Sequence, residues 1–201
     1  MATAQALSAL AFAPGADPAI EQGDLSLALA GAELIDLLGL GAVRLAGARI
    51  LPVAPARTED SMLVEAASEV VQDDSHETVE SWLWRRGNGL AARYRAAPGA
   101  GGSAAPAHSS RNPFRRARPV SVDPRVLGEA TERLETGDPV LAGLAASAGV
   151  RAAPPDEALT GLGADETVVL AEVHQAVTRL AGERQRRSIE QDAFDNVWRG
   201  Y

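Results

Sequence analysis

The sequence of 201 residues has no cysteine and no lysine, and aromatic residues make up only 4% of it. Without cysteine there is no disulfide framework, no thiolate metal site and no cysteine nucleophile. The cationic side chains are therefore arginines, which together with the many alanines and glycines is typical of a bacterial gene of high GC content. The most apolar stretch, residues 25–45, is interrupted by Glu33, Asp36 and Arg44, which would be costly at the centre of a bilayer. We expect a soluble cytoplasmic protein that meets a membrane only at its surface.

Hydrophobic residues amount to 46% of the chain, enough for one sizeable core in a single domain spanning 1–201. Apolar residues recur mostly at helical spacing, and one stretch, 43–53, reads as two short strands around a turn. The pattern predicts a mainly α fold, a helix-bundle core with surrounding helices and one or two short β-hairpins. The expected helices cover 25–38, 59–71, 74–86, 90–97, 124–134, 139–148, 165–180 and 184–198.

Capping residues and helix breakers predict where several of these elements begin and end. Asp24 is expected to cap the first helix, and Asp74 with Glu77 resembles a capping box for the third. Two helices are expected at the C-terminal end, with a break between Leu180 and Arg184. Glycine, alanine, serine and proline dominate residues 97–112, which predicts a flexible insertion.

A run of arginine dominates residues 81–122, which contain no aspartate or glutamate although the whole chain carries a net charge of -8. Such segregation indicates either a surface that meets an anionic partner or a basic face that pairs with carboxylates on neighbouring helices. Nucleic acid is an unlikely partner, because the isoelectric point is near 4.9 and no reading motif is present. The arginines are Arg85, Arg86, Arg93, Arg95, Arg111, Arg115, Arg116 and Arg118.

Two tryptophans precede these arginines, and their spacing predicts different environments. Trp82 and Trp84 are two residues apart, so they face different directions on a helix. Trp82 shares helical spacing with Val79 and Arg86, which predicts that its ring is buried. Trp84 is then the exposed ring, available at an interface.

Residues that could carry chemistry do not form a recognisable catalytic or metal-binding pattern. His76, His108 and His174 are scattered, which does not fit the close spacing of a metal site. No nucleophile motif is found, and the Gly-rich 99–102 lies in the predicted insertion and follows no strand. We expect no enzyme activity, no metal and no cofactor, although a site that sequence does not reveal remains a third, weaker alternative.

Three separated segments resemble, in order, the Golgi phosphoprotein 3 domain family. The first is LALAGAELIDLLGLGAVRLAGARILPV, the second is TEDSMLVEAASEV, and the third is RPVSVDP followed by helices. The resemblance covers roughly residues 5–150 and rests on the order and spacing of these segments. It implies a mainly helical fold with a protruding hairpin and no catalytic activity. Eukaryotic members are peripheral membrane proteins that bind phosphatidylinositol 4-phosphate and the cytosolic tails of glycosyltransferases.

The resemblance also implies where a headgroup could bind. The family's pocket uses a tryptophan and an arginine just before the first core helix, which fall here near Glu21 and at Ala30. It also uses two arginines on a later helix, for which Arg93 and Arg95 are the nearest candidates and Arg85 and Arg86 an alternative placement. Half of that pocket is missing, so we expect charge-driven contact with anionic lipid rather than specific recognition of phosphatidylinositol 4-phosphate. The predicted headgroup contacts are Arg85, Arg86, Arg93, Arg95 and Trp84, with Arg93 and Arg95 favoured.

A second contact is expected at the segment that resembles the family's hairpin. Phe114, Arg115, Arg116 and Arg118 are predicted to contact a membrane or another copy of the chain. The leading hypothesis is a non-enzymatic peripheral membrane protein, located at the inner face of the plasma membrane and bound to an anionic phospholipid surface or an acidic protein. The alternative is a scaffolding subunit that forms homo-oligomers through this hairpin and does not bind lipid.

Overall fold

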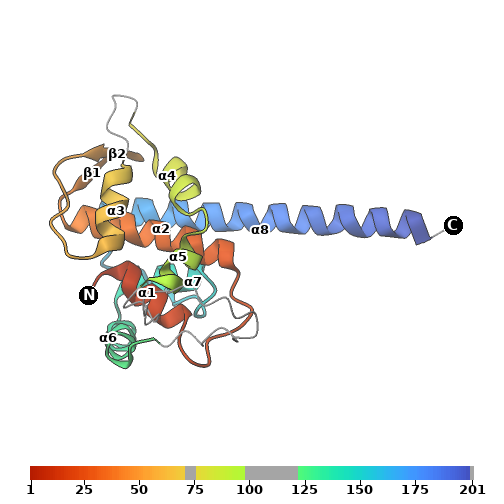
Figure 1. Cartoon of the computed structure of the whole chain (residues 1–201), viewed down its shortest axis with the longest axis horizontal. Coiled ribbons are helices and arrows are strands. Elements are labelled where there is room, and N and C mark those ends of the chain that lie inside the picture. The colour runs from red at the N-terminus through yellow and green to blue at the C-terminus, as the bar shows by residue number, and fades with distance from the viewer. Residues whose placement is uncertain (71–75, 98–121, 200–201) are drawn as a thin grey trace, which may run out of the picture.

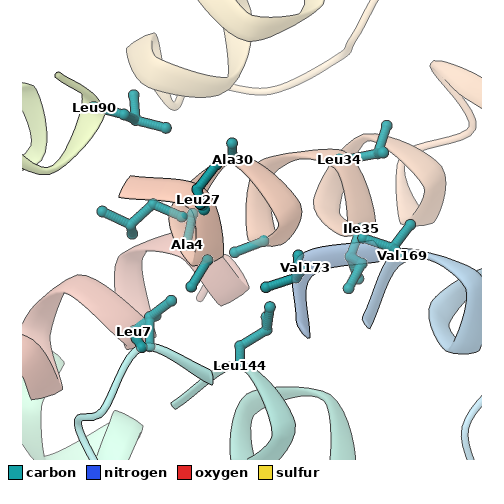
Figure 2. Packing of buried hydrophobic residues seen from close by; sticks show 14 of the residues in the cluster. Ala4, Leu7, Leu27, Ala30, Leu34, Ile35, Leu90, Leu144, Val169 and Val173 are labelled. Carbon is teal, nitrogen blue, oxygen red and sulfur yellow. The ribbon is translucent and has the colours of Figure 1, made fainter. Parts of the chain in front are cut away.

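Helix α2 (Gln22–Gly39) forms the centre of the computed structural model, which describes residues 1–70, 76–97 and 122–199. Helices from distant parts of the chain surround it (Figure 1). Figure 2 shows Leu27, Leu34 and Ile35 of α2 among side chains that come from other helices. Those helices are α1 (Thr3–Ala11), α5 (Leu90–Ala96), α7 (Pro139–Ser147) and α8 (Ala164–Arg199).

Small residues on α2 allow its neighbours to approach closely. Ala28, Ala30, Gly31 and Ala32 are all buried. A Cβ atom added at Gly31 would lie 2.4 Å from Cγ2 of Val173, so the contact between α2 and α8 requires a glycine there. Val169 and Val173 of α8 are completely buried against this side of the core.

The remaining elements pack around these five helices. Strands β1 (Val43–Ala46) and β2 (Arg49–Pro52) form an antiparallel hairpin, in which Val43 pairs with Pro52. Gly47 supplies the positive φ of 62° that the turn requires. The other helices are α3 (Ser61–Glu69), α4 (Val79–Arg86), α6 (Pro124–Glu135) and the short 3-10 helix η1 (Asp156–Leu159).

The mainly α fold class with one short hairpin is confirmed, and so are most of the expected elements. Helix α2 matches the expected 25–38, the hairpin matches 43–53, and α5 matches 90–97. Trp82 is completely buried and Trp84 is 37% exposed, as their spacing predicts. Apart from Ala97, the predicted insertion at 97–112 lies outside the described residues, and so does the predicted hairpin segment with Phe114, Arg115, Arg116 and Arg118.

Three predicted boundaries are wrong. Helix α2 begins at Gln22 after Glu21, and Asp24 lies in its first turn, where it pairs with Arg184 instead of capping the helix. Helix α4 begins at Val79, capped by the Thr78 hydroxyl, because residues 77 and 78 run extended beside β2. The backbone N–H of Ile50 donates to the carbonyl oxygen of Glu77, and the backbone N–H of Val79 donates to the carbonyl oxygen of Ala48, both at 2.8 Å.

The third wrong boundary concerns the C-terminal end, where one helix replaces the two that we expected. Helix α8 is continuous from Ala164 to Arg199 and extends well beyond the rest of the molecule (Figure 1). The expected break contains Gly182, but nothing lies close to this position and the helix passes through it. Among the described residues, no helix is both long and apolar enough to cross a membrane.

Candidate functional site

One member of the predicted arginine surface, Arg86, lies inside the protein. Its side chain is completely buried at the end of α4 and faces Glu33 of α2, which is equally buried. Arg86 Nε donates to Glu33 Oε2 at 2.7 Å, and Nη2 donates to Oε1 at 3.0 Å. Nη1 donates to Oε1 of Glu69 at 2.6 Å. The headgroup contact predicted for Arg86 is therefore wrong, because its donors are satisfied within the core.

Tyr94 of α5 completes this buried polar group. Its hydroxyl donates to Glu33 Oε1 at 3.0 Å, so Glu33 accepts from two different helices. Among the described residues, no buried side-chain nitrogen or oxygen lacks a hydrogen-bond partner. The cluster is a satisfied connection between α2, α4 and α5 and offers no free group for chemistry.

Burial and pairing act in opposite directions on the ionisation of this cluster. Burial raises the pKa of Glu33 above its ordinary value, and the hydrogen bond and charge of Arg86 reduce that rise without abolishing it. Burial lowers the pKa of Arg86, but Glu33 and the glutamates of α3 outweigh it, so the pKa is raised and the guanidinium stays charged. Burial also raises the pKa of Tyr94 well above its ordinary value, which keeps the phenol protonated as the donor.

Arg85 and Arg93 lie at the surface, and both pair with carboxylates. Arg85 makes a two-pronged contact with Glu77, at 2.9 Å from Nε and 2.7 Å from Nη2, and reaches Glu69 Oε2 at 3.4 Å. Its guanidinium also lies over the Trp82 ring, 5.2 Å from the centroid. Arg93 pairs with Glu65 of α3. The structure thus supports, for these two arginines, the interpretation of a basic face paired with neighbouring helices.

Arg95 differs from the other three predicted arginines. It is exposed at the end of α5, and the described residues give it no ion pair. Its guanidinium stacks on the ring of Phe12, 4.8 Å from the centroid. The stacked pair borders a hollow of about 240 Å³ between the end of α1 and the start of α2. The residues that line this hollow include Asp17, Ile20, Gln22 and Leu25.

Of the remaining predicted contact residues, the structure describes Trp84 but not those of the hairpin segment. Trp84 lies on α4 with its ring partly exposed, so the structure leaves it available at the surface. Phe114, Arg115, Arg116 and Arg118 lie outside the described residues, and their role stays a prediction. Within the parts of the chain that are described, no group of acidic and histidine side chains has the arrangement of a metal site.

The structure also describes Ala30 and Glu21, the two positions at which the family resemblance places residues of a headgroup pocket. Ala30 is completely buried in α2, and its carbonyl oxygen accepts a hydrogen bond from the Trp82 indole at 3.0 Å. Glu21 is the exposed residue that precedes α2, where its side chain does not cap the helix. Neither residue can supply a cation to a phosphate.

Comparison with known families shows that the Golgi phosphoprotein 3 (GPP34) family matches residues 4–191. The chain belongs to this family. The family assignment made from three sequence segments is thereby confirmed. The match also includes most of α8, which lies beyond the residues that carried the resemblance. Members of the Golgi phosphoprotein 3 family are generally not enzymes. Comparison with curated proteins and with solved structures gave no significant match.

Sequence reasoning did not identify which carboxylates pair with the arginines, although the sequence contains one signal for the buried pair of Arg86 and Glu33. Val79, Trp82 and Arg86 share one face of α4, so the spacing that buries Trp82 also directs Arg86 inward. Glu33, one of two acids within the apolar stretch of α2, was the matching signal 53 residues earlier. The partners Glu65 and Glu69 on α3 gave no comparable signal, because an acidic helix face is ordinarily solvated.

Proposed function

We propose that this member of the Golgi phosphoprotein 3 family is a non-enzymatic protein that docks peripherally on anionic membranes, through charge rather than through a specific headgroup pocket. The observation that carries the proposal is Arg95, the one predicted headgroup arginine that forms no ion pair with a carboxylate among the described residues. Docking would place the protein at the inner face of the plasma membrane.

The surroundings of Arg95 suit contact with a phosphate group. Stacking on Phe12 holds the guanidinium plane in place while leaving its N–H donors available. The adjoining hollow includes Gln22 at the start of α2, a helix end that no side chain caps. The positive end of the helix dipole adds to the attraction of the site for an anion, and Asp17 at the rim reduces it.

Specific recognition of phosphatidylinositol 4-phosphate receives no support from the described residues. The family position for the headgroup arginine is the buried Ala30, and Arg86 is committed to Glu33. Arg85 and Arg93 would have to exchange carboxylates for lipid phosphates, which reduces their net contribution. Trp84 and the segment containing Phe114, Arg115, Arg116 and Arg118 remain proposed additional contacts.

A comparison of two arginine substitutions tests the proposal. Arg95→Gln should weaken binding to vesicles that contain phosphatidylglycerol about fivefold, since a basic residue near such a surface contributes about 1 kcal/mol. Arg151→Gln is the matched control, because Arg151 is also exposed but lies beside α7, lining a different hollow with Thr131 and Pro154. Equal loss in both variants, or no loss in either, in vesicle co-sedimentation would overturn the assignment of Arg95.

A further inference from the structure

Helix α3 is fixed to the body of the protein at both of its ends. Asp60 caps the first turn and accepts a hydrogen bond from the Gln5 side chain of α1 at 2.8 Å. At the last residue of the helix, Glu69 accepts from Nη1 of the buried Arg86 at 2.6 Å. The position of α3 is therefore set by contacts other than those of Glu65, which lies between these two ends.

The carboxylate of Glu65 is directed toward the arginines of the neighbouring helices. Glu65 lies one turn before Glu69, so the two side chains project from the same side of α3. It pairs with Arg93 of α5, and its Oε1 lies 3.7 Å from Nη1 of Arg86. Among the described residues, Glu65 is the one ion-pair partner found for Arg93. A fixed helix thus supplies the carboxylate that neutralises this arginine.

The pair of Glu65 with Arg93 is open to solvent and contributes little to the stability of the fold. The two side chains are 47% and 36% exposed, and ion pairs with this exposure are weak and are weakened further by salt. Arg86 does not need Glu65, because Glu33 and Glu69 approach it to 2.7 Å and 2.6 Å. The main effect of Glu65 is therefore on the charge that Arg93 presents to the solvent.

We propose that Glu65 competes with anionic membranes for Arg93, so that this arginine contributes to docking only after a lipid phosphate has displaced the carboxylate. The exchange is possible because carboxylate and phosphate oxygens accept hydrogen bonds from the same guanidinium N–H groups. Arg95, two residues further along α5, has no such competitor among the described residues. This role of Glu65 rests on the proposed docking, whose strength it limits.

Glu65→Gln removes the competing charge and keeps a side chain of the same size. In co-sedimentation, the full-length variant should bind vesicles of phosphatidylcholine and phosphatidylglycerol about fivefold more tightly than wild type, the gain expected from one more basic contact. Glu132→Gln is the matched control with the same change in net charge, since Glu132 is exposed on α6 and has no ion pair within the described parts of the chain. It should raise binding far less. An equal gain in both variants would overturn the inference.

A substitution of Arg93 shows whether the gain acts through this arginine. The double variant E65Q/R93Q should bind no more tightly than R93Q, because the group that Glu65 masks is then absent. If E65Q raises binding by the same factor in the R93Q background, Glu65 acts only by general repulsion and the inference is wrong.

Urea denaturation provides the structural control. E65Q should unfold at nearly the same urea concentration as wild type, whereas E69Q should unfold at a lower one, because Glu69 pairs with the buried Arg86. A loss in E65Q as large as that in E69Q would make Glu65 an anchor of α3 and contradict its role as a competitor.

The vesicle measurements also separate this role from the docking on which it rests. If wild type binds anionic vesicles and E65Q binds equally, the role of Glu65 is wrong and the docking stands. If only E65Q binds, and does so through Arg93, the role of Glu65 is supported and docking of the wild-type chain is contradicted. Binding by neither protein contradicts both.

Discussion

Arg86 lies in the core because its guanidinium has carboxylates on two sides and the other residues on its face of α4 are apolar. Glu33 and Glu69 approach it to 2.7 Å and 2.6 Å, and Tyr94 holds the far side of Glu33. Removing one member of a buried ion pair costs more than the pair contributes, since the other charge is left without compensation. The burial of Glu33 and that of Arg86 therefore depend on each other.

Substitution of Arg86 should show this dependence in the free energy of unfolding. Arg86→Met is expected to lower it by about 3–5 kcal/mol, because Glu33 stays buried without its partner. The double variant R86M/E33L should recover most of the loss. Arg85→Met serves as the control and should cost about 1 kcal/mol or less, since Arg85 is partly exposed and its pairs are screened by solvent. Urea denaturation measures all four proteins.

The loss of unfolding free energy in R86M should also depend on pH. Burial already raises the pKa of Glu33, and without Arg86 that pKa rises further. A carboxyl group with a raised pKa in the folded state contributes stability that is fully present below its unfolded pKa and is lost as pH rises through the folded value. The difference between R86M and wild type should thus be smaller at pH about 5 than at about 8. A difference that is constant across this range contradicts the buried charge at Glu33.

Among the elements, α2 could be predicted because several signals in its sequence agree. Its apolar spacing, its small residues and the glycines that follow it all indicate a buried helix, and the structure contains it. The end of α8 could not be predicted in the same way. Gly182 suggests a break only if some other structure competes with the helix there, and nothing approaches it. Likewise, α4 begins late because Glu77 and Val79 bond to the hairpin, a long-range contact that capping patterns do not reveal.

The close contact of α2 with α8 makes a second stability test possible. Gly31→Ala places a methyl group 2.4 Å from Val173 Cγ2, so the helices must separate, and we expect a loss of about 1–3 kcal/mol. Gly128→Ala is the control within α6, where nothing lies within 4 Å of the added Cβ. It should stabilise the protein by about 0.5–1 kcal/mol through helix propensity. Thermal or urea unfolding compares the two, and a stabilising G31A would show that the contact is not tight.

Considered as a whole, the molecule is a helical body in which Arg85, Arg86 and Arg93 pair with carboxylates, and one helix projects from it. The sequence pattern supported the family, the fold class and the burial of Trp82, because these follow from local spacing and order. It did not reveal that α3 would bring Glu65 and Glu69 against the arginines, since that depends on how distant helices pack. The predicted surface of eight arginines is thus reduced, within the described residues, chiefly to Arg95.

Binding of the wild-type chain to vesicles of different charge tests the central proposal most directly. Vesicles of phosphatidylcholine alone are compared with vesicles that also contain phosphatidylglycerol, each at low and high salt. Charge-driven docking predicts binding that rises with the anionic fraction and weakens as salt increases, because salt screens exposed charges. Equal binding to neutral and anionic vesicles, or binding that does not respond to salt, would contradict the account.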